Sequence, residues 1–254
     1  MPNKNNKSNM KILLLDIETS PNTAYVWKLF KENIPLARLM ESSETMCWAA
    51  KWYGDKKVMY DSIYESEPKA MILRIHELMD EADMVVHYYG TGFDVPTLNK
   101  EFLLHGLPPP SPAKQVDLYK VVKSRFKFVS YKLDYVAQKL GLGQKKETSF
   151  QLWVDCMAKK PEAWKKMKAY NQHDVLLLEK VYDRIKPWIK GHANYSVYEG
   201  AVRCPNCANT SFERRGFHYT AASKYQRYHC KGCGNWFRSG ASVAAAPGDK
   251  AINI

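Results

Sequence analysis

The sequence has no uninterrupted apolar stretch long enough to span a bilayer, so we expect no membrane-spanning helix and no membrane partner. The N-terminus, MPNKNNKSNMK, is polar and lacks the apolar core of a secretion signal. We interpret residues 1–10 as a flexible tail and expect a cytoplasmic protein. No internal repeat is visible in the chain.

Acidic residues are in the minority. The chain has 26 Asp and Glu against 38 Lys and Arg, which gives a net charge of +12 and a pI near 9.3. This excess favours a polyanionic partner, although a basic and solvated surface would give the same balance. The 254 residues, 45% of them hydrophobic, allow one substantial domain and a small second one.

The cysteines do not form the pattern of a disulfide framework. Cys47 and Cys156 stand alone and are expected to be small buried thiols. The other four form CPNC and CKGC with a 22-residue spacer, which is ligand spacing for a tetrahedral Zn²⁺ site: Cys204, Cys207, Cys230 and Cys233. The pattern is similar to a zinc ribbon, expected over 201–239 after a linker at 191–200. A redox role for one cysteine pair is the alternative.

Cations and aromatic residues are interleaved through this cysteine-bearing segment. The mixture suits single-stranded nucleic acid, because bases stack on aromatic rings while phosphates pair with cations. In one alternative, Trp236 and Phe237 form the ribbon's own small core and the arginines are solvated; in another, the ribbon contacts protein. The chain after Ser239 is rich in small residues, and 240–254 is expected to be disordered. The residues concerned are Arg203, Arg214, Arg215, Lys224, Arg227, Lys231 and Arg238, with Phe212, Phe217, Tyr219, Tyr225, Tyr228, Trp236 and Phe237.

The hydrophobic pattern predicts an α/β fold. Strands are expected at 11–19 and 84–89, together with a meander of 23–30, 46–54 and 56–64 that turns at Gly54. Helices are expected at 68–80, 93–106, 117–126, 131–141 and 161–186. Ser130 is the expected cap of the fourth helix, while Pro161 and Pro187 bound the last. The polar, basic stretch 141–149 is expected to be a loop.

Two carboxylates interrupt the first predicted strand, LLLDIETS. Asp16 and Glu18 are two residues apart, so in a strand they point to the same face. Buried acids of like charge are strongly disfavoured unless a cation meets them. The pattern therefore asks for a cation, which either lysines at the strand end or a metal ion would supply.

Further candidate residues lie in two other segments. Asp94 follows a predicted strand at the start of a helix, where it could equally cap that helix. Tyr170 and Asp174 are four residues apart on the last helix and share one face. Tyr170 could instead be a core residue, and His173 is expected on the surface or in packing.

Three short segments resemble, in order, the three motifs of the DEDD exonucleases: DIET, FD after a short strand, and Tyr-x-x-x-Asp on a late helix. The tyrosine places the resemblance in the branch that includes the proofreading domains of DNA polymerases, since Ala169 stands where the histidine branch has its histidine. The stretch QVDLYKVVKSRFKFVSYKLDYVAQKLGLG is similar to exonuclease domains related to family B polymerases. The resemblance covers residues 11–190 and implies an RNase H-like fold, a mixed sheet flanked by helices.

The resemblance also implies a site and a reaction. Asp16, Glu18, Asp94 and Asp174 would hold two Mg²⁺ or Mn²⁺ ions, with Asp16 bridging them and Tyr170 orienting the nucleophile. The implied activity is 3′–5′ hydrolysis of DNA to nucleoside monophosphates. The same chemistry on RNA, or a non-catalytic nucleic-acid-binding accessory, are the alternatives.

The resemblance has one gap and leaves the partners open. Relatives often carry an asparagine shortly before FD, whereas this chain reads HYYGTGFD, so His87, Tyr88 or Tyr89 must fill that region. The expected partner is single-stranded DNA or a 3′ end, with a separate DNA polymerase or replication protein, in bacterial or phage replication or repair. Gln144–Thr148 with Lys123, Arg125 and Lys127 would line a substrate path or form a solvated face.

Overall fold

The computed structural model of the protein describes residues 10–199 and 202–245. Nearly all of the predicted N-terminal tail, and residues 246–254 of the predicted C-terminal tail, lie outside the described residues. Lys11–Tyr182 forms one compact unit, and the described residues from Asp183 onward belong to a second. In the described ranges, no helix is both long enough and apolar enough to cross a membrane.

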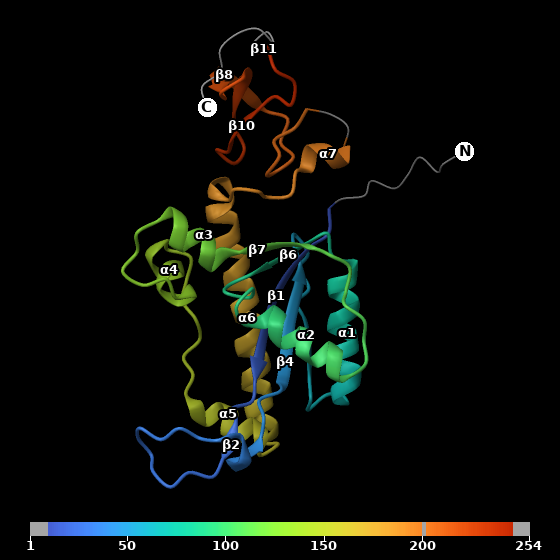
Figure 1. Ribbon diagram of the computed structural model, residues 1–254, viewed down its shortest axis with the longest axis vertical. Helices are drawn as coiled ribbons and strands as arrows, with labels where there is room; N and C mark the ends of the chain where they lie inside the picture. The colour runs from blue at the N-terminus through green and yellow to red at the C-terminus, as the bar shows by residue number, and fades with distance from the viewer. Residues whose placement is uncertain (1–9, 200–201, 246–254) are drawn as a thin grey trace, which may run out of the picture. The chain divides into compact units, whose positions relative to one another are not determined.

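A mixed sheet of five strands lies at the centre of the first unit (Figure 1). The strand order is β5-β4-β1-β6-β7, and β1 pairs antiparallel with β4 and parallel with β6. The strands are β1 (Ile12–Thr19), β4 (Thr45–Trp52), β5 (Met59–Ser62), β6 (Met84–His87) and β7 (Lys114–Asp117). This arrangement confirms the predicted α/β fold with a mixed sheet.

The alternation of side chains along β1 decides what each face of the sheet contacts. Leu13, Leu15 and Ile17 pack in one buried cluster with α1 (Pro68–Glu81) and α2 (Asp94–Leu104). The alternate residues point to the opposite face, where α6 (Pro161–Ile185) contacts Asp16. A period of two thus brings the carboxylates of β1 to α6.

The helices of the first unit follow the predicted ranges closely, with one addition and one correction. Besides α1, α2 and α6, the unit has α3 (Leu118–Arg125), α4 (Leu133–Lys139) and α5 (Phe150–Met157), of which α5 was not predicted. Lys132, and not Ser130, precedes the first residue of α4. The Ser130 hydroxyl instead accepts a hydrogen bond from the Lys132 amide at 3.4 Å.

The prediction of a sheet strand over 23–30 is wrong. Only β2 (Thr23–Ala24) is extended there, and it pairs with β3 (Leu39–Glu41), beside the short helix η1 (Leu36–Arg38), outside the main sheet. Glu32 accepts hydrogen bonds from the amides of Trp27 and Lys28, at 3.0 and 2.7 Å, and so closes the segment into a loop. Those amides are therefore not available to a strand ladder.

The second unit is built around an antiparallel sheet. Its strands are β8 (Phe212–Tyr219), β9 (Ser223–Cys230), β10 (Trp236–Arg238) and β11 (Ala244–Ala245), and β9 pairs with the other three. The segment 191–200, expected to be a linker, contains α7 (Tyr195–Glu199), which follows η2 (Lys186–Trp188). Within the segment expected to be disordered, Ala244–Ala245 form β11 and pair with Ser223 and Lys224.

Candidate functional site

A cluster of carboxylates lies on the α6 side of β1. Three carboxylates each place one oxygen within 4.8 Å of the other two: those of Asp16, Glu18 and Asp174. Asp174 is more than 150 residues from the other two in sequence. Asp94 is not in this close group. It is the first residue of α2, and its Oδ1 accepts a hydrogen bond from the Ile17 amide, between Asp16 and Glu18, at 3.2 Å. This bond ties Asp94 to β1, so Asp94 is more than a helix cap.

Asn171 fixes the central carboxylate. Its side-chain amide is fully buried and donates a hydrogen bond to Oδ2 of Asp16 at 2.7 Å. Asn171 lies on α6 three residues before Asp174, so both side chains reach the same surface of the sheet. One turn of α6 therefore supplies one carboxylate of the cluster and a hydrogen bond that orients another.

Burial and mutual repulsion make the acids reluctant to ionise. Burial raises the pKa of Asp16 well above its usual value, and the charges of Asp94 and Glu18 add to this effect. Burial also raises the pKa of Glu18 to about 8 and that of Asp94 to about 7. The Asp174 pKa is raised for the same reason, although Lys145 opposes the shift. Such a cluster is stable in its ionised form only beside positive charge.

Lys145 supplies part of that charge. Its ammonium donates to Oδ2 of Asp174 at 2.5 Å and to the Tyr170 hydroxyl at 3.4 Å. Burial disfavours the charged amine, but Asp174 and Asp16 outweigh this and raise the Lys145 pKa. A single ammonium cannot neutralise the whole cluster. The other Asp174 oxygen, Oδ1, is buried and has no hydrogen-bond partner within residues 10–199 and 202–245.

These observations fit a divalent cation site. Hard cations such as Mg²⁺ and Mn²⁺ take carboxylate oxygens, and the cluster offers several of them on one side of the sheet. An unpartnered buried carboxylate oxygen is costly unless something positive reaches it. The donor set therefore agrees with the ions that the sequence resemblance implies.

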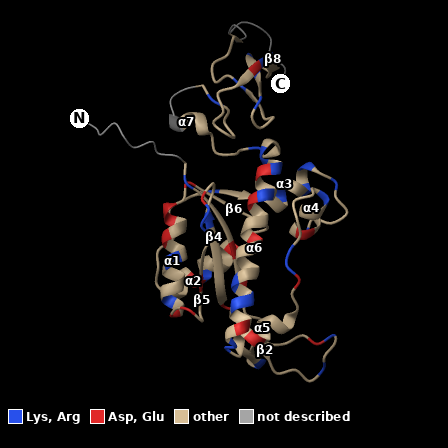
Figure 2. Cartoon of the chain, turned by 180° about the vertical axis from the view of Figure 1, so that it is seen from behind, with Lys and Arg blue, Asp and Glu red and all other residues tan. Residues whose placement is uncertain are grey.

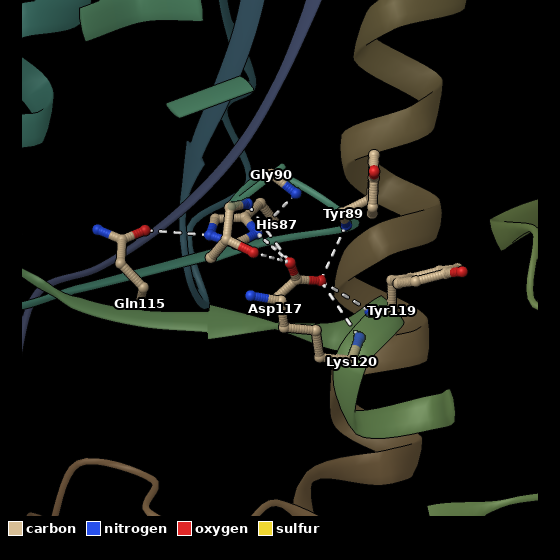
Figure 3. Close-up of polar contacts among 8 residues, drawn as sticks. His87, Tyr89, Gly90, Gln115, Asp117, Tyr119 and Lys120 are labelled. Carbon is tan, nitrogen blue, oxygen red and sulfur yellow. Dashed lines mark hydrogen bonds and ion pairs between the residues drawn. The ribbon is translucent and has the colours of Figure 1, made fainter. Parts of the chain in front are cut away.

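Asp117 orders the loop that leads into Asp94 (Figure 3). It ends β7 and caps α3 by accepting from the amides of Tyr119 and Lys120. Its carboxylate also accepts from the Tyr89 amide at 2.9 Å and from the Thr91 hydroxyl at 2.6 Å. Tyr89 has a φ of 68°, in the left-handed region that a bulky residue rarely adopts. Asp117 thus holds a strained turn directly before α2.

His87 supports the same loop from inside. It is fully buried, its Nδ1 accepts from the Gly90 amide at 3.1 Å, and its Nε2 lies 3.0 Å from Oε1 of Gln115 (Figure 3). Burial lowers the His87 pKa, which agrees with a neutral ring protonated on Nε2. A Cβ at position 90 would lie 2.3 Å from the His87 ring, so only glycine fits there.

An aromatic cleft opens beside the acids. Its volume is about 620 Å³, and its lining includes Asp16, Lys145 and four tyrosines, Tyr88, Tyr89, Tyr119 and Tyr131. The ring of Tyr119 makes edge contacts with those of Tyr88, Tyr89 and Tyr131, at 5.1 to 6.3 Å between centroids. Tyr89 is half exposed, so its ring is accessible to a ligand. Tyr88 and Tyr89, from the stretch HYYGTGFD, thus both line this cleft.

The four cysteines of the second unit converge. The Sγ atoms of Cys204 and Cys233 are 3.7 Å apart, those of Cys207 and Cys230 are 3.6 Å apart, and all four lie within 4.8 Å of one another. A tetrahedral Zn²⁺ with Zn–S bonds near 2.3 Å places its sulfurs about 3.8 Å apart. The cysteine geometry is therefore compatible with a zinc ribbon.

Sequence reasoning missed three residues of the first unit: Lys145, Asn171 and Asp117. Lys145 lies in the loop 144–148, which was expected to line a substrate path or to be solvated, without a specific partner. The spacing of Asn171 and Asp174 contained a usable signal, because residues three apart on a helix are neighbours. Asp117 gave no comparable signal, because it ends the short and largely polar strand KQVD.

Comparison with known proteins places the chain in a family. A model described as the RNase_H superfamily matches residues 38–186, more than half of the chain, and the protein belongs to this superfamily. Its RNase H-like fold supports a nuclease role. No curated protein matches the chain.

One similar solved structure is the family B DNA polymerase from the hyperthermophilic archaeon Pyrobaculum calidifontis. The match has 18% sequence identity and a TM-score of 0.49, and it covers 70% of this chain. The chain spans about a quarter of the polymerase's length, since the match covers 25% of that protein.

Proposed function

We propose that this protein is a metal-dependent 3′–5′ exonuclease that hydrolyses DNA to nucleoside monophosphates. The observation that carries the proposal is the convergence of Asp16, Glu18 and Asp174 within 4.8 Å, with Asp94 tied to the same strand. A surface that only binds nucleic acid gains nothing from clustered negative charge facing a phosphate. Membership of the RNase H superfamily supports the nuclease class.

In this proposal, Asp16, Glu18, Asp94 and Asp174 hold two Mg²⁺ or Mn²⁺ ions. When bound, such ions offset the charge of the phosphodiester and make water a better nucleophile. Asn171 keeps the Asp16 carboxylate in one orientation through its 2.7 Å hydrogen bond. Ligand geometry is thereby set before substrate arrives.

Tyr170 acts by positioning. Burial and the charge of Asp174 raise the pKa of Tyr170 above its ordinary value of 10, so its hydroxyl stays protonated at neutral pH. A neutral phenol on the face of α6 that carries Asp174 can hydrogen-bond the attacking water, but it is a poor base. Lys145, 3.4 Å from that hydroxyl, holds the ring in place and adds positive charge beside the scissile phosphate.

The aromatic cleft receives the terminal base. Its tyrosine rings adjoin Asp16, so a base stacked on Tyr89 brings its own phosphate toward the carboxylates. A base can enter a cleft of this kind only when it is unpaired. The preferred substrate is accordingly a single-stranded 3′ end.

One time course tests this function. Matched oligonucleotides of DNA and RNA, single- and double-stranded and labelled at the 5′ end, are incubated with the purified full chain and Mg²⁺ or Mn²⁺. We expect single-stranded DNA to shorten stepwise from its 3′ end. If every 3′-ended substrate stays intact, the proposal is wrong, and if RNA is consumed faster than DNA, the assigned substrate is wrong.

A further inference from the structure

The register of the β8–β10 sheet separates the ribbon's aromatic residues onto two faces. Tyr228 pairs with Phe237 of β10 and with Arg214 of β8, so these residues share one face. There the rings of Phe212, Tyr228 and Phe237 contact one another, with centroids 5.2 to 5.4 Å apart. This face contains the ribbon's small apolar core. Phe237 belongs to this core, as one of the alternatives in the sequence analysis expected.

The opposite face has a different composition. His229 pairs with Trp236, and Arg227 pairs with Arg238, so these four residues and Tyr225 line what we call the arginine–aromatic face. Trp236 is 53% exposed, and both arginines are exposed. Trp236 is therefore not part of the ribbon core, contrary to the alternative that placed it there with Phe237. Because its ring is exposed, packing in the core does not account for a tryptophan at this position.

The arginines on this face stack on aromatic rings. The Arg238 guanidinium lies 3.7 Å from the centre of the Tyr225 ring, and that of Arg227 lies 5.2 Å from the Trp236 ring. Stacking holds a planar guanidinium in place, and its edge can still donate to a phosphate. The face thus presents oriented cations next to an exposed indole.

The charge of the segment identifies the kind of partner. Between residues 202 and 245 the sequence has seven lysines and arginines but one acid, Glu213. Figure 2 shows the resulting blue segments around this sheet. Glu213 pairs with His229 in the register and so lies on this face, but Arg215 at 2.8 Å holds its carboxylate and offsets its charge. A polyanion with planar groups, and not an acidic or neutral protein surface, matches cations that alternate with exposed rings.

We propose that the arginine–aromatic face binds single-stranded nucleic acid, with a base stacked on Trp236 and phosphates contacted by Arg227 and Arg238. This deepens the proposed function, on which it rests for the class of substrate. The ribbon would hold the strand at a site separate from the carboxylate cluster and so increase the time that one strand stays bound.

The test measures binding without cleavage. The zinc-loaded full chain is titrated against a fluorescein-labelled 30-nucleotide oligothymidylate, without added Mg²⁺ or Mn²⁺, over a range of salt concentrations. We expect Arg227→Ala with Arg238→Ala to weaken binding about tenfold. The slope of log affinity against log salt should fall by about 1.4, because each lost phosphate contact on a single strand removes about 0.7.

A matched control separates this face from net charge. Arg214→Ala with Lys224→Ala removes the same charge from the same segment, and the register places both residues on the opposite face, which carries Tyr228. We expect the control to bind nearly as tightly as the natural chain. An equal loss in both double variants would overturn the assignment of the face.

Trp236→Ala provides the second readout. It should weaken binding about tenfold while leaving the salt slope unchanged, because stacking releases no counterions. Zinc content, measured for every variant, shows that the ribbon is still folded. Unchanged oligothymidylate binding in Trp236→Ala and in the Arg227/Arg238 variant would overturn the proposal. The ribbon would then not hold the strand through this face. Because no cleavage is measured, a failed nuclease assay and a failed binding assay remain distinguishable.

Discussion

Replacing Lys145 with methionine keeps the length of the side chain but removes its charge. Lys145 bonds to Asp174 at 2.5 Å, and the Asp174 side chain is fully buried whereas that of Lys145 is 30% exposed. Removing one partner of a buried ion pair leaves the other charge uncompensated. In metal-free protein at pH 8, we expect the free energy of unfolding to fall by about 3 kcal/mol, the low end of the range because Lys145 is partly exposed.

The expected shift in melting temperature follows from that figure. For a unit of this size, 1 kcal/mol corresponds to about 2–4 °C, so the variant should melt about 6–12 °C lower than the natural chain. Saturating Mn²⁺ should close most of this gap, because ions held by the same carboxylates replace the missing charge. Thermal unfolding followed by circular dichroism, with and without Mn²⁺, measures both effects.

Lys145→Arg is the matched control, since it keeps the charge. It should melt near the natural chain in metal-free buffer. The reasoning is refuted if the methionine variant is as stable as the natural chain without metal, or if Mn²⁺ stabilises both chains by the same amount. In either case Lys145 would not be neutralising the acids.

Three further predictions concern other parts of the molecule. Asn171→Ala frees the Asp16 carboxylate and should lower Mn²⁺ affinity or cleavage rate about 10- to 100-fold with an intact fold. Asn171→Gln should restore part of this loss. Equal Mn²⁺ binding and cleavage in the natural chain and both variants would remove Asn171 from the site. The Glu18 pKa is raised from 4.5 to about 8, so a proton must leave for metal to bind, and calorimetric Mn²⁺ affinity should rise about tenfold per unit between pH 6 and 8. Folding stability of the metal-free protein should change with pH in the opposite direction, because the folded state holds the Glu18 proton more tightly than the unfolded chain does. The stability from this proton is complete below pH 4.5 and is lost as the pH rises to 8. A metal-free protein that becomes more stable over this range would contradict the raised pKa. Cys207→Ser should abolish zinc retention and unfold the ribbon, while the thermal transition of residues 11–182 remains; full zinc retention in that variant would exclude Cys207 as a ligand.

Local periodicity was enough to predict much of the fold and to nominate the acids. The alternation in LLLDIETS predicts both a buried strand and a shared face for Asp16 and Glu18, and β1 has this arrangement. Helical spacing likewise predicts one shared face for Tyr170 and Asp174, although the resemblance to the DEDD motifs was needed to select these two residues. These signals survive because each depends on a few residues within one regular element.

Interactions between distant segments were not predictable from such patterns. Lys145 reaches Asp174 because its loop is held by other segments: the Lys145 amide donates to Oδ1 of Asp134 at 2.7 Å, and His173 Nε2 lies 2.8 Å from the Gln144 carbonyl oxygen. For the segment 23–30, the local pattern predicted a strand that the structure does not have. Its hydrophobic residues satisfy a strand pattern, yet a hydrogen-bonding side chain, Glu32, closes the backbone into a loop instead.

The most direct measurement is anomalous diffraction at the manganese edge from crystals of the full chain grown with Mn²⁺ and a thymidine monophosphate. We expect anomalous peaks within coordination distance of the Asp16 carboxylate, with Glu18 and Asp174 as further ligands and the base in the tyrosine-lined cleft. Carboxylates that remain without manganese at saturating concentration, with Lys145 as their sole cation, would contradict the central claim that this cluster is a metal site.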